Sequence, residues 1–239
     1  MREAHALVTG ATSGIGKETA RQLLAEGCTV YVGARDADRG QSAVDELGKG
    51  AELLMLDVTD AASIVAAADR IERLDVLVNN AGISDAGQQA PDLSVDVLRR
   101  VYETNVFAVV AVTNAFLSLL RQSPHPRIVN ISSGTGSLAW STGPNPQFDH
   151  RMGGAAAAYR SSKTALNALT VFYAQALAAD NIKVNTLAPG LRATNLNPRA
   201  AQLGDDPAEA AAQAVSLALL PDDGPTGTFF SWDGTVAPW

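Results

Sequence analysis

Residues 4–26 read AHALVTGATSGIGKETARQLLAE, and this stretch decides the class of fold. A short apolar run, Ala4–Thr9, leads into a glycine-rich turn, Gly10–Gly16, and then into Lys17–Glu26, which has the pattern of a helix. Glycines permit positive φ and a close approach to the backbone, and the first turn of a helix offers free N–H groups to a phosphate. An ordinary tight turn is the alternative for the glycines alone. Their place between a strand and a helix favours a dinucleotide site.

The same alternation of short apolar strands and helices continues along the chain. Strands are expected at Ala4–Thr9, Thr29–Ala34, Glu52–Leu56, Asp75–Val78, Ile128–Ile131, Val184–Leu187 and 227–234. Helices are expected at Lys17–Glu26, Ala37–Leu47, from Thr59 or Asp60 to about Glu72, at Ser94–Leu120, Ala155–Ala179 and Pro207–Leu219. This pattern predicts an α/β fold, a doubly wound parallel sheet of the Rossmann type with about seven strands and helices on both faces. A single domain is expected over residues 1–239, with 1–90 mainly binding a cofactor and 91–239 carrying catalysis and substrate.

Candidate catalytic residues lie in the second half of the chain. Tyr159 and Lys163 stand four residues apart in YRSSK, a spacing that puts both side chains on one face of a helix. An ammonium beside a phenol lowers the pKa of the phenol, so Tyr159 is expected to exchange a proton near neutral pH. Ser132 and Ser133 follow a buried strand, at the sheet edge where catalytic groups gather. Asn105 lies in an apolar helix, where it is a satisfied core amide or holds a water or a bend.

Three further segments point to the same cofactor. The strand Thr29–Ala34 ends at Ala34–Arg35, where an acid would select NAD and a cation suits the 2′-phosphate of NADP. Arg35 therefore favours NADP(H), and a solvated loop arginine is the alternative. Asp57–Val58 ends the third strand, where the acid can accept from an adenine amino group. The amides of Asn79–Gly82 can tie strand ends together and line the cofactor floor, and an ordinary asparagine-rich turn is the alternative.

Composition excludes some classes of function. The chain is 46% apolar and 18% charged, with a formal charge of −7, and its pI of about 4.9 argues against a non-specific nucleic-acid binder. Cys28 is expected to be a buried thiol, and the three histidines lack metal-ligand spacing, so no metal site is expected. His150 is interpreted as a surface residue. With no signal-peptide pattern at the start and no run of about 18 apolar residues, a cytoplasmic protein without a membrane partner is expected.

Taken in order, TGATSGIG, Asp57–Val58, NNAG, Asn105, NISS, YRSSK and APG resemble the short-chain dehydrogenase/reductase family over essentially the whole chain. The resemblance implies the strand order 3-2-1-4-5-6-7 and a catalytic tetrad of Asn105, Ser133, Tyr159 and Lys163. It implies that Tyr159 is the general acid, that Ser133 hydrogen-bonds the carbonyl oxygen, that Lys163 lowers the Tyr159 pKa and holds the ribose, and that Asn105 anchors a water. The cofactor contacts expected from the motifs and the resemblance are Gly10, Thr12, Ser13, Gly14, Ile15, Gly16, Arg35, Asp57, Val58, Asn79, Ala81, Gly82, Tyr159, Lys163, Pro189, Gly190 and Thr194.

Within the family, the stretch after the second strand and the closing GPTGTFF are most similar to NADPH-dependent carbonyl reductases. The hypothesis is reduction of a ketone or aldehyde to an alcohol; oxidation of an alcohol with NADP and a dinucleotide sensor without turnover are the alternatives. The long segment Gly134–Gly154 is expected to be irregular, Leu191–Asp206 a flexible flap, and the site fairly open. Trp140, Phe148 and Leu191 are candidate pocket lining, with local loop packing as the alternative. A homo-oligomer is possible and a monomer is not excluded.

Overall fold

The computed structural model describes residues 3–84, 87–148 and 153–239, which form a parallel seven-stranded sheet in the order β3-β2-β1-β4-β5-β6-β7. The strands are β1 (His5–Thr9), β2 (Thr29–Ala34), β3 (Ala51–Met55), β4 (Val76–Asn79), β5 (Arg127–Ile131), β6 (Lys183–Ala188) and β7 (Phe229–Ser231). The order reverses between β1 and β4, and such a switch point leaves a crevice at the carboxyl ends of the strands. The predicted fold class and strand order are confirmed.

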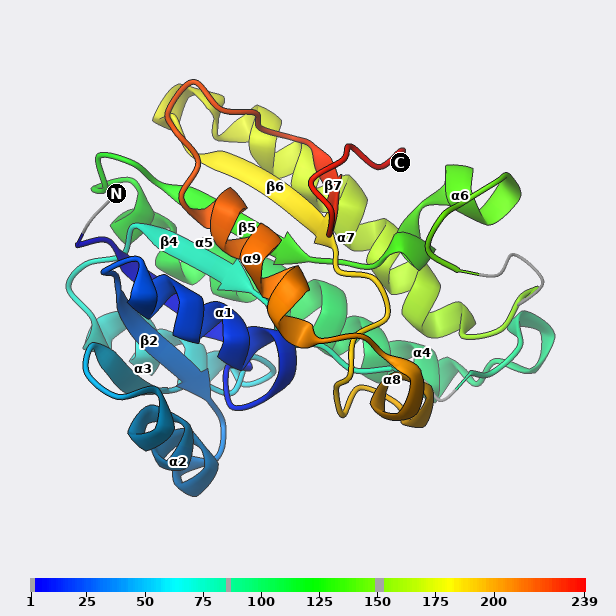
Figure 1. Cartoon of the computed structure of the whole chain (residues 1–239), viewed down its shortest axis with the longest axis horizontal. Helices are drawn as coiled ribbons and strands as arrows, with labels where there is room; N and C mark the ends of the chain where they lie inside the picture. The colour runs from blue at the N-terminus through cyan, green and yellow to red at the C-terminus, as the bar shows by residue number, and fades with distance from the viewer. Residues whose placement is uncertain (1–2, 85–86, 149–152) are drawn as a thin grey trace.

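Helices cover both faces of the sheet (Figure 1). They are α1 (Gly14–Ala25), α2 (Ala37–Leu47), α3 (Ala61–Arg70), α4 (Val95–Tyr102), α5 (Ala108–Leu120), α6 (Leu138–Thr142), α7 (Ala157–Ala176), α8 (Pro198–Leu203) and α9 (Pro207–Ala218). Helices α1, α2 and α9 contribute to the hydrophobic cluster on one face, and α3, α5 and α7 to the cluster on the other. Strands from both halves of the chain join in one sheet. The assignment of 1–90 and 91–239 to separate tasks stays a prediction.

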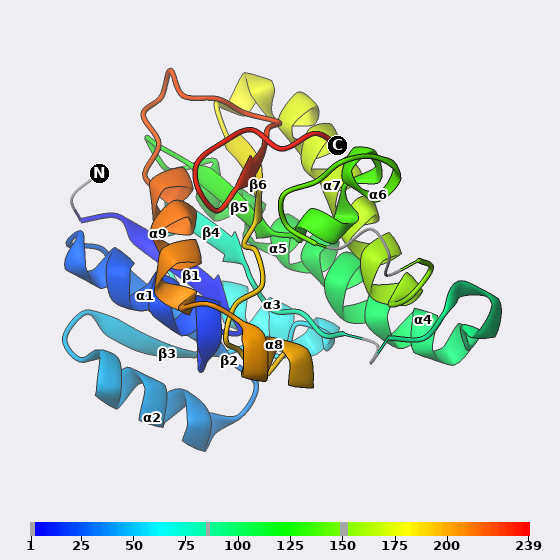
Figure 2. The ribbon, with the colours of Figure 1, turned by 45° about the vertical axis from the view of Figure 1, so that its right-hand side comes forward.

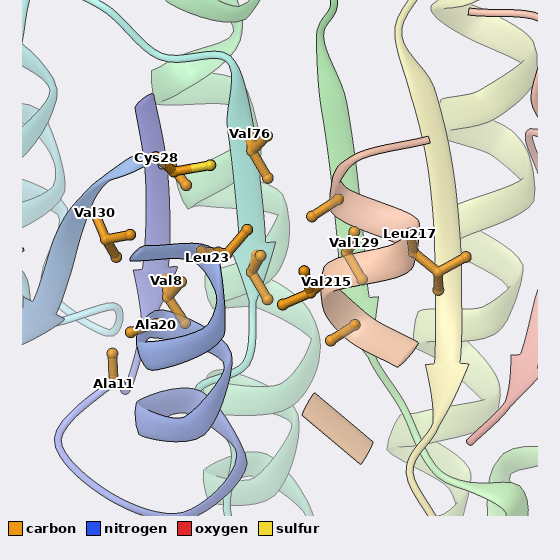
Figure 3. Packing of buried hydrophobic residues seen from close by; sticks show 14 of the residues in the cluster. Val8, Ala11, Ala20, Leu23, Cys28, Val30, Val76, Val129, Val215 and Leu217 are labelled. Carbon is orange, nitrogen blue, oxygen red and sulfur yellow. The ribbon is translucent and has the colours of Figure 1, made fainter. Parts of the chain in front are cut away.

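The core follows from the alternation of side chains along each strand. In β1, Val8 faces α1 and α9, whereas Leu7 faces the cluster formed with α3, α5 and α7. Figure 3 shows Leu23 of α1 and Val215 of α9 packed over the strands, and both belong to the same buried cluster as Val8. Each fully buried aliphatic side chain of this kind contributes about 1.5–3 kcal/mol. Cys28 is 5% exposed in this cluster, which confirms the expected buried thiol.

Several element boundaries differ from the expectation. Helix α1 begins at Gly14, three residues before the expected start, because the glycine turn feeds directly into its first turn. The segment expected to be irregular contains a 3-10 turn, Gly134–Gly136 (η3), and the short helix α6, capped by the Ser137 hydroxyl, which accepts from the amide of Trp140 at 3.0 Å. The expected flap contains α8. Local capping, which the pattern of apolar residues does not reveal, accounts for both short helices.

The expected helix Ser94–Leu120 is interrupted by one π-helical turn, Glu103–Phe107 (η2), between α4 and α5. By length and composition alone, the stretch Val95–Leu120 is apolar enough to cross a membrane, and 44% of its most apolar window is buried inside the fold. Val112, Phe116 and Leu120 of α5 belong to the core cluster against the sheet. The expected absence of a membrane partner stays a prediction.

Candidate active site

A cavity of about 450 Å³ opens at the carboxyl ends of the strands, beside the switch point between β1 and β4. Its lining begins at the glycine-rich turn after β1, passes the ends of β2, β4 and β5, and reaches the segment after β6. Residues separated by more than a hundred positions therefore share one wall. Because parallel strands all end at this edge, the fold places their following residues around a single site.

The glycine-rich turn is shaped for close approach. Gly10 has φ +64°, and a Cβ built on Gly16 would lie 2.3 Å from the side chain of Asn80 and 2.7 Å from the carbonyl oxygen of Gly10. Asn80 fastens the turn, since its Nδ2 donates to the carbonyl oxygens of Thr9 at 2.9 Å and Gly10 at 3.2 Å. The first turn of α1 has no acidic residue, and Ser13 makes no side-chain cap there. The free N–H groups of this helix end are therefore suited to a pyrophosphate.

Tyr159 and Lys163, one turn apart on α7, line the other end of the same cavity. The Nζ atom of Lys163 lies 5.8 Å from the centre of the Tyr159 ring and donates to the carbonyl oxygen of Ile131 at 2.8 Å. Ser133, directly after β5, hydrogen-bonds Tyr159 and lies 2.9 Å from the Oγ1 atom of Thr135. The arrangement joins two hydroxyls and a buried ammonium, as a site for a developing alkoxide requires.

The pKa values of this pair differ from the expectation. Burial raises the pKa of Tyr159, and the hydrogen bond from Ser133 opposes that shift without reversing it. Burial also lowers the pKa of Lys163 to about 8, so its ammonium stays charged at neutral pH. The expected lowering of the Tyr159 pKa by Lys163 does not appear in this arrangement, in which burial dominates and the Nζ atom donates to the carbonyl oxygen of Ile131. Tyr159 therefore holds its proton firmly at neutral pH.

Asn105 lies in the π-helical turn, is 1% exposed and has its amide fully bonded. Its Oδ1 accepts from the amide of Ile83 at 2.9 Å, and its Nδ2 donates to the carbonyl of Ile83 at 2.9 Å and to Ser162 Oγ at 3.0 Å. A Cβ built on Gly82 would lie 3.3 Å from Asn105 Oδ1 and 3.5 Å from Lys163 Nζ. Asn105 is thus a satisfied core amide at a helix irregularity, and it ties the segment after β4 to α7 beside Lys163.

At the far end of the cavity, Arg35 and Arg39 both line the wall after β2. Both side chains are exposed, and neither forms an ion pair with any residue that the structure describes. Asp36 caps α2 by accepting from the amide of Arg39 at 2.9 Å, which holds the two arginines at the start of that helix. Hydrogen bonds from Thr59 lower the pKa of Asp57, and the charge of Arg35 acts in the same direction.

Most of the residues expected to contact a cofactor surround the cavity. Those in its lining are Gly10, Thr12, Ser13, Gly14, Ile15, Gly16, Arg35, Asp57, Val58, Ala81, Gly82, Tyr159, Lys163, Pro189 and Thr194. Asn79, Asn105, Ser133 and Gly190 are not in the lining. Asn79 instead ties strands and helices together, since its Nδ2 donates to Thr113 Oγ1 at 3.1 Å and to Asn130 Oδ1 at 2.9 Å. The expected tying of strand ends is confirmed for Asn79, and its expected place at the cofactor floor stays a prediction.

Sequence reasoning missed Arg39, Ile83, Thr104, Asn195 and Leu196, which also line the cavity. The available signal for Arg39 was its place in the first turn of the helix that begins just after Arg35. Thr104 lies in the π-helical turn, and no comparable signal marks it.

Trp140, Phe148 and Leu191, the candidate pocket lining, are not in the cavity wall. Trp140 is 7% exposed and packs with Phe229 and Ala237, and Phe148 lies against the same cluster. For Trp140 and Phe148 the structure therefore shows local packing, which is the alternative interpretation. His150 lies outside the described residues.

Comparisons with known proteins agree with this geometry. A family model described as short chain dehydrogenase matches residues 4–203. The (-)-isopiperitenone reductase of Mentha piperita is 33% identical, over 98% of each chain. Among solved structures, the NADPH-bound carbonyl reductase from chicken fatty liver superposes with a TM-score of 0.82, 28% identity and full coverage of both chains. A 3-oxoacyl-(acyl-carrier protein) reductase with bound NAD from Brucella melitensis has a TM-score of 0.81, 28% identity, and coverage of 96% of this chain and 89% of that one.

Since the family model covers most of the chain and a relative of known name matches nearly all of it, the protein is an oxidoreductase of the short-chain dehydrogenase/reductase family.

Proposed function

We propose that this oxidoreductase reduces a ketone or aldehyde to an alcohol with NADPH, and that Tyr159 is the general acid. The observation that carries the proposal is the arrangement at the two ends of one cavity. Tyr159 and Lys163 line one end, and Ser133 hydrogen-bonds Tyr159. Arg35 and Arg39 line the other end. The glycine-rich turn lies between them, packed so closely on the protein that Cβ atoms at Gly14 and Gly16 would collide with neighbouring residues.

When bound, the nicotinamide would supply the hydride. The negative charge then develops on the carbonyl oxygen of the substrate, and Tyr159 donates its proton to that oxygen. The phenol is protonated at neutral pH and so has a proton to donate. Ser133 supports the same oxygen as a second donor, and Lys163 contributes a positive charge from a buried position. Through its hydrogen bonds to Ile83, Asn105 also holds the adjacent Gly82 beside Lys163.

The choice of NADPH rests on the residues after β2. The strand ends at Ala34, which is 4% exposed and carries no carboxylate to bond a ribose hydroxyl. Two guanidinium groups follow within one helical turn, and a planar guanidinium matches a phosphate with paired hydrogen bonds. The solved relatives bind NADPH in one case and NAD in another, so the argument depends on these two side chains rather than on likeness.

The test is consumption of NADPH and of NADH against a panel of ketones and aldehydes. We expect NADPH to be preferred, and Tyr159→Phe to lower kcat by about 100-fold or more while the Kd for NADPH changes little. Unchanged turnover in the variant would remove Tyr159 from the acid role. Turnover only in the direction of alcohol oxidation would favour the dehydrogenase alternative, and NADPH binding without any turnover would favour a sensor.

A further inference from the structure

The segment between β6 and α9, residues 191–206, reaches the cavity and returns through α8 (Figure 2). Thr194, Asn195 and Leu196 of this segment line the cavity wall. Thr194 packs against the glycine-rich turn, since a Cβ built on Gly14 would lie 2.9 Å from its Cγ2 atom. The segment therefore forms the side of the site opposite the strand ends, and its placement bears on dinucleotide binding.

The two ends of the segment, residues 191–193 and 204–206, lie side by side, and we call this pair the neck. The amide of Ala193 donates to the carbonyl of Asp205 at 2.8 Å, and the amide of Asp205 donates to the carbonyl of Leu191 at 3.0 Å. Gly204 lies so close to the other side of the neck that a Cβ there would meet the carbonyl carbon of Arg192 at 2.2 Å. The base of the expected flap is therefore fastened, because its two ends are hydrogen-bonded to each other, and its flexibility stays a prediction.

One buried cation holds this neck. Arg192 is 3% exposed, and its Nε donates to the carbonyl of Pro189 at 2.6 Å, before the segment begins. Its Nη1 donates to the carbonyl of Asp206 at 3.3 Å, at the end of the segment, and to Glu209 Oε2 at 2.6 Å. The guanidinium also stacks over the ring of Trp232, with 4.6 Å between its carbon and the ring centre. The planar fork of arginine satisfies all these partners at once, which an ammonium does not.

The partners of Arg192 connect the neck to the phosphate-binding end of the cavity. Glu209 lies in the first turn of α9, and α9 packs on α1, with Ala214 in the same buried cluster as Ala20 and Leu23. Gln22 of α1 donates to the carbonyl of Ala208 at 2.9 Å. Since α1 begins at Gly14 in the glycine-rich turn, the neck and that turn are held on the same pair of helices.

We propose that Arg192 is a positioning residue for the dinucleotide site: by bonding both ends of the neck, it holds Thr194, Asn195 and Leu196 over the cavity. Closing a segment of this length costs conformational entropy, and the buried guanidinium offsets that cost in the free protein. The proposal rests on the proposed function only in assuming that a nicotinamide dinucleotide occupies this cavity.

The experiment compares Arg192→Met, Arg192→Lys and the matched control Arg199→Met. Methionine keeps the length and loses the charge, and Glu209 stays hydrated because its side chain is 54% exposed. Arg199 lies in α8 of the same segment, is exposed and has no ion pair among the described residues. The measurements are the Kd for NADPH, kcat at saturating NADPH, the melting temperature, and amide hydrogen exchange of Ala193 and Asp205 in the free protein.

If removing the Arg192 guanidinium leaves the segment over the cavity only about a tenth of the time, the Kd for NADPH rises about 10-fold. The reason is that the apparent affinity scales with the fraction of the protein that is in the binding-competent state. We expect this rise for Arg192→Met, with kcat at saturation nearly unchanged and faster exchange at Ala193 and Asp205. Arg192→Lys should lie between Arg192→Met and the unchanged chain, and Arg199→Met should match the unchanged chain. A folded Arg192→Met protein with unchanged Kd and unchanged local exchange would overturn the proposal.

If Arg192→Met does not fold, Arg192→Lys decides the matter by the same two measurements. A general structural role would lower the melting temperature without a selective change in Kd or in the exchange of the neck amides, and would likewise overturn the proposal. Failure of the proposed function has a different signature. In that case no carbonyl compound is reduced, or NADH binds in place of NADPH. The Arg192 variants are then tested by the same hydrogen-exchange rates and by the Kd for whichever dinucleotide binds.

Discussion

Gly136 lies where the segment that carries Ser133 packs against the helix that carries Tyr159 and Lys163. A Cβ built on Gly136 would lie 2.8 Å from the carbonyl carbon of Lys163, 2.9 Å from its Cβ and 3.1 Å from its carbonyl oxygen. The hydroxyl of Thr164 also donates to the carbonyl of Gly136 at 2.9 Å. The two backbones are therefore in direct contact, and this contact sets the distance from Ser133 to α7.

Gly136→Ala perturbs that distance by a known amount. Carbon atoms in van der Waals contact stay about 3.5 Å apart, so the η3 turn and α7 have to separate by about 0.6 Å. Overpacking of this kind costs about 1–3 kcal/mol, which lowers the melting temperature of a chain of this size by about 2–10 °C. Because a misplacement of about 1 Å can cost about 100-fold in rate, we expect kcat/KM to fall by about 10- to 100-fold.

The assay is carbonyl-dependent oxidation of NADPH, with the melting temperature and the Kd for NADPH measured in parallel. Gly154→Ala is the matched control, since its Cβ would have contacts of 3.4 Å or more and no positive φ is involved. Its free energy of unfolding should change by less than about 0.5 kcal/mol. A folded Gly136→Ala protein with the kcat/KM of the unchanged chain would refute the argument that this contact sets the geometry between Ser133 and Tyr159.

Three further predictions concern other parts of the site. Replacing Arg35 and Arg39 together by Gln should raise KM for NADPH by about 100-fold and leave KM for NADH nearly unchanged, because each charged hydrogen bond contributes about 1.5–3 kcal/mol; equal losses for both cofactors would contradict the phosphate assignment. Burial lowers the Lys163 pKa from 10.5 to about 8, so the folded state binds fewer protons than the unfolded state between these values, and the free energy of unfolding should rise with pH across that window relative to Lys163→Met. NMR titration of Lys163 should show a midpoint of about 8, and a midpoint at 10.5 would contradict the prediction. Asn105→Ala leaves both backbone groups of Ile83 without their partner and should cost about 2 kcal/mol in urea unfolding, since each unpaired buried group costs about 1–3 kcal/mol and Ile83 is partly open to water; unchanged unfolding would show that water replaces the amide.

The sequence predicts the sheet order and the catalytic segment well because both follow from short-range patterns and from the family motifs. Strand-helix alternation and the glycine-rich turn are readable within windows of about ten residues. The four-residue spacing of Tyr159 and Lys163 is likewise local, and the structure places both on one face of α7.

The pKa of Tyr159 illustrates what spacing alone does not decide. The spacing puts an ammonium near a phenol, but the direction of the shift depends on burial and on what the ammonium bonds. In the structure Lys163 bonds the carbonyl of Ile131, more than thirty positions away, and burial dominates. Trp140 is a similar case, because its packing on Phe229 depends on how β7 and α6 meet.

By itself, the sequence determined the fold class and the edge of the sheet at which chemistry occurs, since periodicity and turn residues act over a few positions, and the strand order followed from the resemblance of its motifs to the family. Only the tertiary structure decided that Arg39 joins Arg35, that Asn105 bonds Ile83 and Ser162, and that Arg192 holds the neck before α9. The physical reason is that hydrogen bonds and packing between distant segments depend on distances of a few tenths of an ångström, and residue patterns carry no information about such distances until the chain is folded.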